Sequence, residues 1–124
     1  MNVLDLLLKT DVSKYTLPEK EFKIKSLSEK AGEDVIFKVR AIGLDRLEEL
    51  RETNSGMDLY IMVVTDSVAD PSLKDEKLKE KFGAATPKDL IKRLLLPGEI
   101  EALYLGITRM SGYGHDAVEE IKKK

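Results

Sequence analysis

The side chains best suited to acid–base chemistry lie near the C-terminus, where His115 precedes Asp116. A histidine beside a carboxylate can act as a general base held by an orienting group. Adjacent residues rarely point at one target, however, and neither a nucleophile nor a second ligand follows in the segment "SGYGHDAVEE". We therefore interpret His115 as a loop residue that precedes a helix.

Two acidic pairs, Asp75 with Glu76 and Glu119 with Glu120, could in principle act as paired acids or metal ligands. Each pair lies in a charge-dense segment, which is typical of a solvated helix face. The segment "GYG" lacks the glycine spacing and the preceding strand of a phosphate-binding loop. The sequence therefore predicts no catalytic, cofactor-binding or metal-binding residue, no cofactor and no enzymatic activity.

Length and composition narrow the class of protein. A chain of 124 residues fits one domain with one core, and the absence of Cys excludes disulfides and thiolate chemistry. The net charge of -2, with acidic and basic residues interleaved, gives no reason to expect binding to nucleic acid or to a membrane. The N-terminus lacks the pattern of a signal peptide, and no apolar run approaches the length of about 18 residues that spans a bilayer. We expect a soluble cytoplasmic protein.

The first segment predicts a short amphipathic helix over residues 2–10, with Val3, Leu4, Leu7 and Leu8 at helical spacing. The following "TDVSKYTLPEK" has no regular pattern and contains a proline, which indicates a tether. We therefore divide the chain into a helix and tether over residues 1–18 and a helix-rich domain over residues 19–124.

A β-hairpin is predicted next. Phe22 and Ile24 alternate with lysines, and the alternation returns in "VIFKVRA", where Val35, Phe37 and Val39 share a face. The intervening "SLSEKAGED" is interpreted as the hairpin loop. Because a lone two-stranded hairpin is marginal in water, its apolar face must pack against helices or a third strand.

The rest of the chain predicts helices. Leu44, Leu47 and Leu50 indicate one helix, and "SLKDEKLKEKFG" indicates another, closed by a glycine. Residues 57–69 contain a β-branched apolar run that suits a buried strand or a buried helix, and its length favours the helix. The fold class is thus α+β and mostly α-helical, with four to six helices packed with a small antiparallel β-hairpin.

Two apolar helices meet at the segment "LLLPGE". Thr86 and Pro87 are typical of a helix start, and Pro97 disfavours helical geometry at Leu96 while suiting the start of the next helix. The segment therefore predicts a tight helix–helix corner. The apolar stripe of the helix before the corner consists of Leu90, Ile91, Leu94 and Leu95. The stripe of the helix after the corner consists of Ile100, Leu103, Tyr104, Ile107 and Met110. A last short helix is expected from about Asp116, with Val118 and Ile121 on its apolar face.

The order of these pieces resembles the XkdN-like tail assembly chaperones of tailed bacteriophages and of prophages of Gram-positive bacteria. The resemblance is carried by "FKVRAIGLDRLEELRE", "ADPSLKDEKLKEKFG", "TPKDLIKRLLLPGEIEAL" and "MSGYGHDAVEEIKKK", and it spans about residue 22 to the end. Its most specific part is "LLLPGEIEAL" with the Gly-Tyr near the end. The final segment is shorter than the acidic and basic tail of the family, and the N-terminal helix is generic.

The resemblance implies a small cytoplasmic protein that binds the long, hydrophobic, helical tape-measure protein, keeps it soluble while tail tube subunits assemble, and is absent from the mature virion. The tail tube protein and a second copy of the chain are further expected partners. An alternative is a structural adaptor or tail completion protein that is retained in the virion. A regulatory or antitoxin-like domain would need a basic recognition helix, and the sequence has none.

Helices joined by a tight corner can bury their faces on one another and on the hairpin, so we expect part of the corner to be core, but a chain of this size has little interior in which to bury both stripes. Either its outer edge or the face of the first helix is then the binding surface, for the client or for self-association. The candidate partner-binding residues are Val3, Leu4, Leu7, Leu8, Leu95, Leu96, Ile100, Leu103 and Tyr104.

Overall fold

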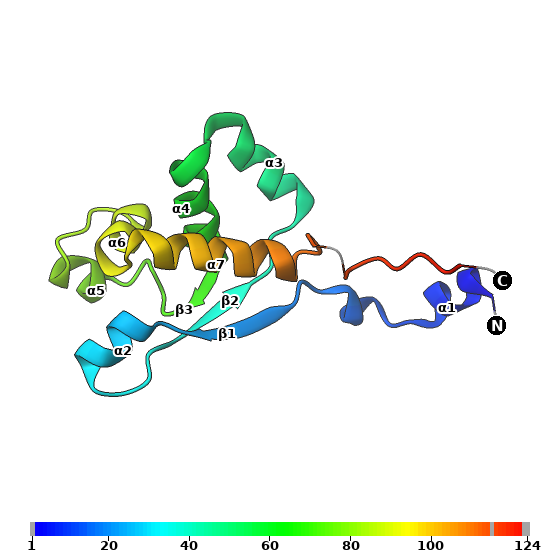
Figure 1. The fold of residues 1–124 in the computed structure, drawn as a ribbon, viewed down its shortest axis with the longest axis horizontal. Coiled ribbons are helices and arrows are strands. Elements are labelled where there is room, and N and C mark those ends of the chain that lie inside the picture. The colour runs from blue at the N-terminus through cyan, green and yellow to red at the C-terminus, as the bar shows by residue number, and fades with distance from the viewer. Residues whose placement is uncertain (1, 115, 123–124) are drawn as a thin grey trace.

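The structure is a computed structural model that describes residues 2–114 and 116–122. Seven α-helices, one 3-10 helix and three strands are found in this part of the chain, which confirms a mostly helical α+β fold (Figure 1). In chain order they are α1 (Val3–Lys9), η1 (Val12–Tyr15), β1 (Glu19–Lys23), α2 (Lys25–Ala31), β2 (Ile36–Arg40), α3 (Leu44–Thr53), α4 (Gly56–Ser67), β3 (Val68–Asp70), α5 (Glu76–Lys81), α6 (Pro87–Leu94) and α7 (Pro97–Met110).

The predicted hairpin is present and gains a third strand. Strand β2 lies in the centre and pairs antiparallel with β1 and with the short β3. Phe37 and Val39 are buried, whereas the residues between and beside them on β2 are exposed, as the period of two predicted. One face of the sheet therefore points into the core and the other points to water.

The connection between β1 and β2 differs from the predicted loop, because its first part forms the helix α2. Gly32 ends this helix in the left-handed conformation with φ of 77°, which glycine adopts without strain. The expectation of an irregular loop was wrong because a seven-residue helix leaves too little periodicity to be recognised.

Helices cover the inner face of the sheet. Helix α7 runs across it next to β2, and α4 packs against α7, with α3 and α6 packed in turn against α4 (Figure 1). The ambiguous run after residue 56 is helical, as favoured, and buries Leu59, Ile61 and Val64. Val68 was expected to continue that helical face, but it begins β3 and pairs with Val39. The side chains buried most completely are Phe37, Val39, Leu47, Val63, Val64, Leu90, Ile91 and Ile107.

The helix–helix corner is confirmed. The Thr86 hydroxyl accepts a hydrogen bond from the backbone N–H of Asp89 at 3.1 Å and caps α6. Helix α6 ends at Leu94, and Pro97 occupies the first turn of α7. The chain therefore turns within two residues, Leu95 and Leu96, which have extended backbone.

The last predicted helix is wrong within the described residues, since 116–122 contain no helix. Val118 and Ile121 are 86% and 78% exposed. A short helix is marginal in water unless tertiary packing supports one of its faces. These two side chains have no such packing in the structure, so their spacing alone did not produce a helix.

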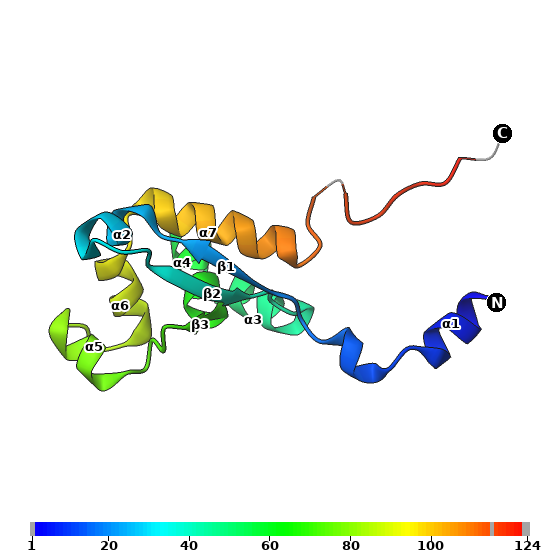
Figure 2. The same ribbon diagram turned by 90° about the horizontal axis from the view of Figure 1, so that it is seen from below.

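The N-terminal helix is present, but it lies apart from the body of the protein. No residue of α1 or η1 is buried. Figures 1 and 2 show this segment extending away from the body of the protein beyond the start of β1. The C-terminal segment leaves the same end of the molecule, and Figure 2 shows that the two segments diverge.

Ser28 connects α2 to the strands and gives a first stability prediction. Its hydroxyl accepts a hydrogen bond from the backbone N–H of Val35 and donates one to the carbonyl of Ile24, each at 2.8 Å. Replacing Ser28 with alanine removes the partner of the Val35 amide, at a cost of about 1 to 2 kcal/mol that the better helix propensity of alanine offsets in part. We expect a net loss of about 1 kcal/mol in the free energy of unfolding, measured by urea titration. Glu29→Ala on the exposed side of α2 is the control, and equal stability of S28A and wild type would contradict the prediction.

Candidate partner-binding surfaces

The apolar face of α1 is exposed over its whole length. Asn2 caps the helix by accepting a hydrogen bond from the backbone N–H of Asp5 at 2.8 Å. The four predicted residues, Val3, Leu4, Leu7 and Leu8, are 71%, 64%, 57% and 76% exposed. A helix with no buried residue gains nothing from tertiary packing, so its leucines are available to a partner.

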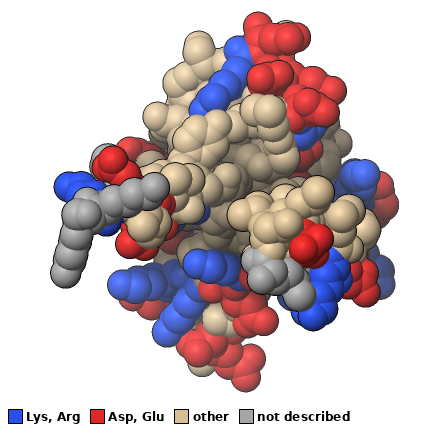
Figure 3. All heavy atoms as spheres, turned by 90° about the vertical axis from the view of Figure 1, so that its right-hand side faces the viewer, with Lys and Arg blue, Asp and Glu red and all other residues tan. Residues whose placement is uncertain are grey.

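The exposed apolar surface continues along the tether. Val12 and Tyr15 in η1 and Leu17 after it are each at least 46% exposed. Figure 3 looks onto the end of the molecule from which both terminal segments extend, where uncharged side chains cover a broad area and acidic side chains gather at the top, over the α3–α4 end. The exposed apolar residues of α1, together with Val12, Tyr15 and Leu17, are typical of an interaction surface.

The predicted residues at the corner fall into two groups. Leu95, Ile100 and Leu103 are at most 5% exposed and belong to the core, so each offers little surface to a partner in this fold. Leu96, by contrast, caps α7 and is 57% exposed. The outer edge of the corner is therefore Leu96, and Leu105, which is 56% exposed, lies nine residues further along α7.

The side chain of Tyr104 is half-buried and packs against neighbouring aromatic side chains. Its ring stacks on that of Tyr60 with the centroids 4.2 Å apart. The guanidinium of Arg51 lies beside this pair, 5.7 Å from the centre of the Tyr113 ring, within cation–π range. These contacts join α3, α4 and α7 to Tyr113, three residues beyond the end of α7, and they hold the Tyr104 ring against the body of the protein.

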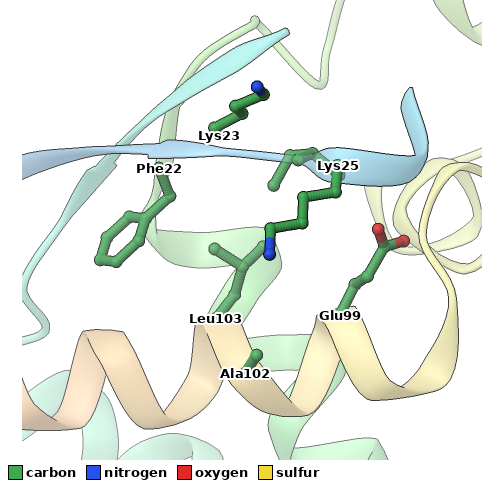
Figure 4. A pocket seen from close by; sticks show the side chains of 7 residues that line it. Phe22, Lys23, Lys25, Glu99, Ala102 and Leu103 are labelled. Atoms are coloured by element: carbon green, nitrogen blue, oxygen red, sulfur yellow. The ribbon is translucent and has the colours of Figure 1, made fainter. Parts of the chain in front are cut away.

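A groove between β1 and α7 was not predicted. Its apolar side chains are Phe22, Ile24, Ala102 and Leu103, and its charged ones are Lys23, Lys25 and Glu99. Figure 4 shows the side chain of Lys25 extending from the start of α2 toward α7, on the same side as Glu99. The volume is about 270 Å³, slightly below the roughly 300 to 1,000 Å³ of small-molecule sites. The groove is therefore sized for a few side chains of a protein partner.

Small residues on α7 explain how β1 comes close enough to form this groove. A Cβ atom added to Gly106 would lie 3.1 Å from the ring of Phe22. Ala102 lies one helical turn earlier on the same side of α7. This alanine and glycine at helical spacing were the sequence signal that could have located the groove.

Glu99 holds one wall of the groove in place. Its carboxylate accepts a hydrogen bond from the backbone N–H of Leu96 at 2.8 Å and another from the hydroxyl of Ser26 at 2.7 Å. Burial raises the pKa of Glu99, but these hydrogen bonds, together with the nearby Lys30, outweigh burial and lower the pKa below its ordinary value of 4.5. The carboxylate therefore stays charged at neutral pH and joins the corner to α2.

The lowered pKa of Glu99 predicts a pH-dependent stability. Because the carboxyl binds its proton less tightly when folded, its contribution is complete above the unfolded value of 4.5 and is lost as the pH falls through the folded value. Glu99→Gln keeps an acceptor but cannot titrate. We expect the wild type to be more stable than E99Q at pH 7 and the difference to shrink below pH 4.5, measured by urea unfolding at several pH values. Glu101→Gln removes the same charge from an exposed position, and a difference that does not depend on pH would contradict the assignment.

The acidic pairs considered for chemistry have other positions in the described part of the structure. The Asp75 carboxylate accepts a hydrogen bond from the backbone N–H of Leu78 and caps α5, while Glu119 and Glu120 are exposed. His115 lies outside the described residues. Among the residues that are described, no group of three or more His, Asp or Glu side chains could hold a metal ion. None of the helices in the same part of the chain is long and apolar enough to cross a membrane.

Comparison with protein families decides the class. The model of a family described as the phage XkdN-like tail assembly chaperone protein matches residues 57–122, which is more than half of the chain. The chain belongs to this family. The part that matches begins in α4 and includes the corner and α7, so it contains one wall of the groove. Helix α1 lies outside it.

A solved structure shows the same fold as this tail assembly chaperone. The crystal structure of the protein YqbN is similar with a TM-score of 0.61 and 24% sequence identity, over 85% of this chain and 98% of YqbN. At that identity the similarity concerns the fold alone. A comparison with curated proteins gave no match.

Proposed function

We propose that this tail assembly chaperone binds the hydrophobic, helical tape-measure protein in the host cytoplasm, keeps it soluble while the tail assembles, and is absent from the mature virion. The protein acts by binding and carries out no chemical step. Membership of the family supports the general role. The observation that carries the choice of surface is the face of α1, on which no residue is buried.

The mechanism follows from the shape of α1 and its tether. A helical client presents apolar stripes, and a second amphipathic helix can cover such a stripe by laying leucines against it. Residues 10–18 can extend to about 30 Å at roughly 3.3 Å per residue, so α1 can reach a client some distance from the body. Asp5 and Lys9 on the same helix remain beside the contact, where charge sets orientation more than affinity.

The outer edge of the corner is a second region of contact in this proposal. Leu96 and Leu105 are exposed on the rigid body, whereas α1 is carried by the tether. In Figure 1 the corner lies at the end of the body opposite to the one from which the tether leaves, so a client helix would have to run along the body to contact both α1 and the corner. The tail tube protein is a further partner, because assembly takes place around the same client.

The test is co-expression of this chain with the tape-measure protein of the same phage or prophage. We expect the client to move into the soluble fraction and to co-elute with the chaperone on size exclusion. A client that stays insoluble while this protein is folded would contradict the proposal. Mass spectrometry of purified virions then tests the alternative, since a structural adaptor is present in the particle and an assembly chaperone is not.

A further inference from the structure

Nothing in the described part of a single copy fills the groove between β1 and α7. Likewise, no surface of that copy covers the apolar face of α1. The groove offers the apolar side chains of Phe22, Ile24 and Ala102 at its surface or floor. Helix α1 offers an unpartnered row of leucines. A protein that exposes apolar surface of this kind tends to bury it against a partner or to aggregate.

We propose that the groove between β1 and α7 binds α1 of a second copy of this chain, so that copies associate while no client is bound. Self-association itself does not depend on the proposed function. The further consequence, that the tape-measure protein competes with the groove for α1, rests on that function. The arrangement would store the client-binding helix in a protected place until a client arrives.

Charge favours α1 as the occupant. Lys25, the first residue of α2, extends toward α7, and Glu99 lies on the α7 side with its carboxylate charged at neutral pH (Figure 4). The side chain of Lys23 points away from α7 and forms an ion pair with Asp34 at 3.0 Å, so Lys25 is the cation that faces the groove. Helix α1 carries one acid and one base, Asp5 and Lys9, one helical turn apart. An α1 helix that lies along the groove can therefore set Asp5 against Lys25 and Lys9 against Glu99.

The direction of the chain favours a second copy over the chain's own α1. The tether joins the body at Glu19, whereas the groove lies at the opposite end of β1 and beyond, from Phe22 to Lys25. In Figures 1 and 2 the segment that carries α1 runs away from that end in both views. Its own α1 would have to reverse direction at Glu19, while a neighbouring groove can be reached without a reversal.

The contact joins two different surfaces, so it can be broken from either side. Leu4→Lys with Leu7→Lys disables the helix and keeps its propensity, because lysine and leucine are similar helix formers. Ala102→Arg fills the groove from an exposed position on α7. Glu101→Arg places the same side chain at the neighbouring exposed position, which does not line the groove, and serves as the matched control.

The experiment is sedimentation equilibrium of the purified protein without client, over a concentration series up to about 1 mM, since a seven-residue helix buries less than the roughly 1,200 Å² of a standard interface. We expect the mass of the wild type and of Glu101→Arg to rise with concentration above the 14.0 kDa monomer. Each disabled variant alone should remain monomeric. An equimolar mixture of the two should form a dimer, because one intact α1 and one intact groove remain.

Each other outcome overturns the inference in a recognisable way. A monomeric wild type would mean that the chain's own α1 or the client alone uses the groove. Association of Ala102→Arg at wild-type strength would mean that α1 helices pair with each other. Failure of the mixture to form a dimer would exclude the exchange of α1. None of these results concerns the solubility of the client, so they leave the proposed function to its own test.

Discussion

Replacing Leu4 and Leu7 together with lysine is expected to abolish the solubilisation of the tape-measure protein and to leave the fold unchanged. Burying one leucine contributes about 1.5 to 3 kcal/mol, so the double substitution should weaken client binding roughly 100-fold or more. The fold should not respond, because no residue of α1 is buried. The measurements are the soluble fraction of the co-expressed client and the thermal midpoint of the purified variant.

The matched control for this prediction lies on the same tether. Val12→Lys with Tyr15→Lys removes two exposed apolar side chains and adds two charges, but outside α1. We expect this control to retain most of the activity. Equal loss in both variants would show that the tether as a whole, and not the face of α1, carries the binding. Ala102→Arg in the groove should solubilise the client at least as well as the wild type, since it removes only the competing site.

Much of the fold could be predicted because its signals are local. The alternation in β2 assigned Phe37 and Val39 to one buried face, and the cap formed by Thr86 with the following proline located the start of α6. Helix α4 was the harder case, since β-branched residues suit a strand. Its length decided the question correctly, because a buried apolar run beyond strand length is typical of a helix.

The elements that were not predicted are those that tertiary contacts define. Strand β3 has three residues and exists because it pairs with β2, so it shows no periodicity of its own. Helix α2 is also short, and the hydroxyl of Ser28 joins it to the backbone of the strands. The segment after residue 115 gives the converse case, in which Val118 and Ile121 had helical spacing but no surface to pack against.

Tertiary contacts also limit what the sequence shows of the candidate surfaces. An apolar stripe shows which side of a helix is hydrophobic, but not which other helices or strands bury it. The sequence could not show that β1 and the other helices bury Ile100 and Leu103 while Leu96 at the turn stays in water. The groove depends on the approach of β1 to Gly106, a contact between residues far apart in the chain. The exposure of helix α1, on which no residue is buried, agrees with the irregular segment that follows it in the sequence.

Phe37→Ala is expected to cost about 3 to 5 kcal/mol in the free energy of unfolding, enough to leave much of the protein unfolded if its total stability is in the usual range. Phe37 lies on the central strand, is 2% exposed, and is paired across the sheet with Phe22, whose ring forms part of the groove and lies over Gly106. The truncation leaves a cavity between the sheet and α7. It also removes the support of Phe22, so the groove should lose its shape before the protein unfolds. Urea titration gives the free energy of unfolding.

The adjacent residue supplies the control for Phe37. Ile36 is on the same strand but points to the open face and is 38% exposed, so Ile36→Ala should cost less than about 1 kcal/mol. The two variants separate burial from strand propensity, because both lose a large β-forming side chain at neighbouring positions. Similar losses in the two variants would mean that the sheet is not packed on α7 as the structure shows. A large loss at Phe37 alone would place the core between β2 and α7. It would also support the role of Phe37 behind Phe22, which lines the groove from β1.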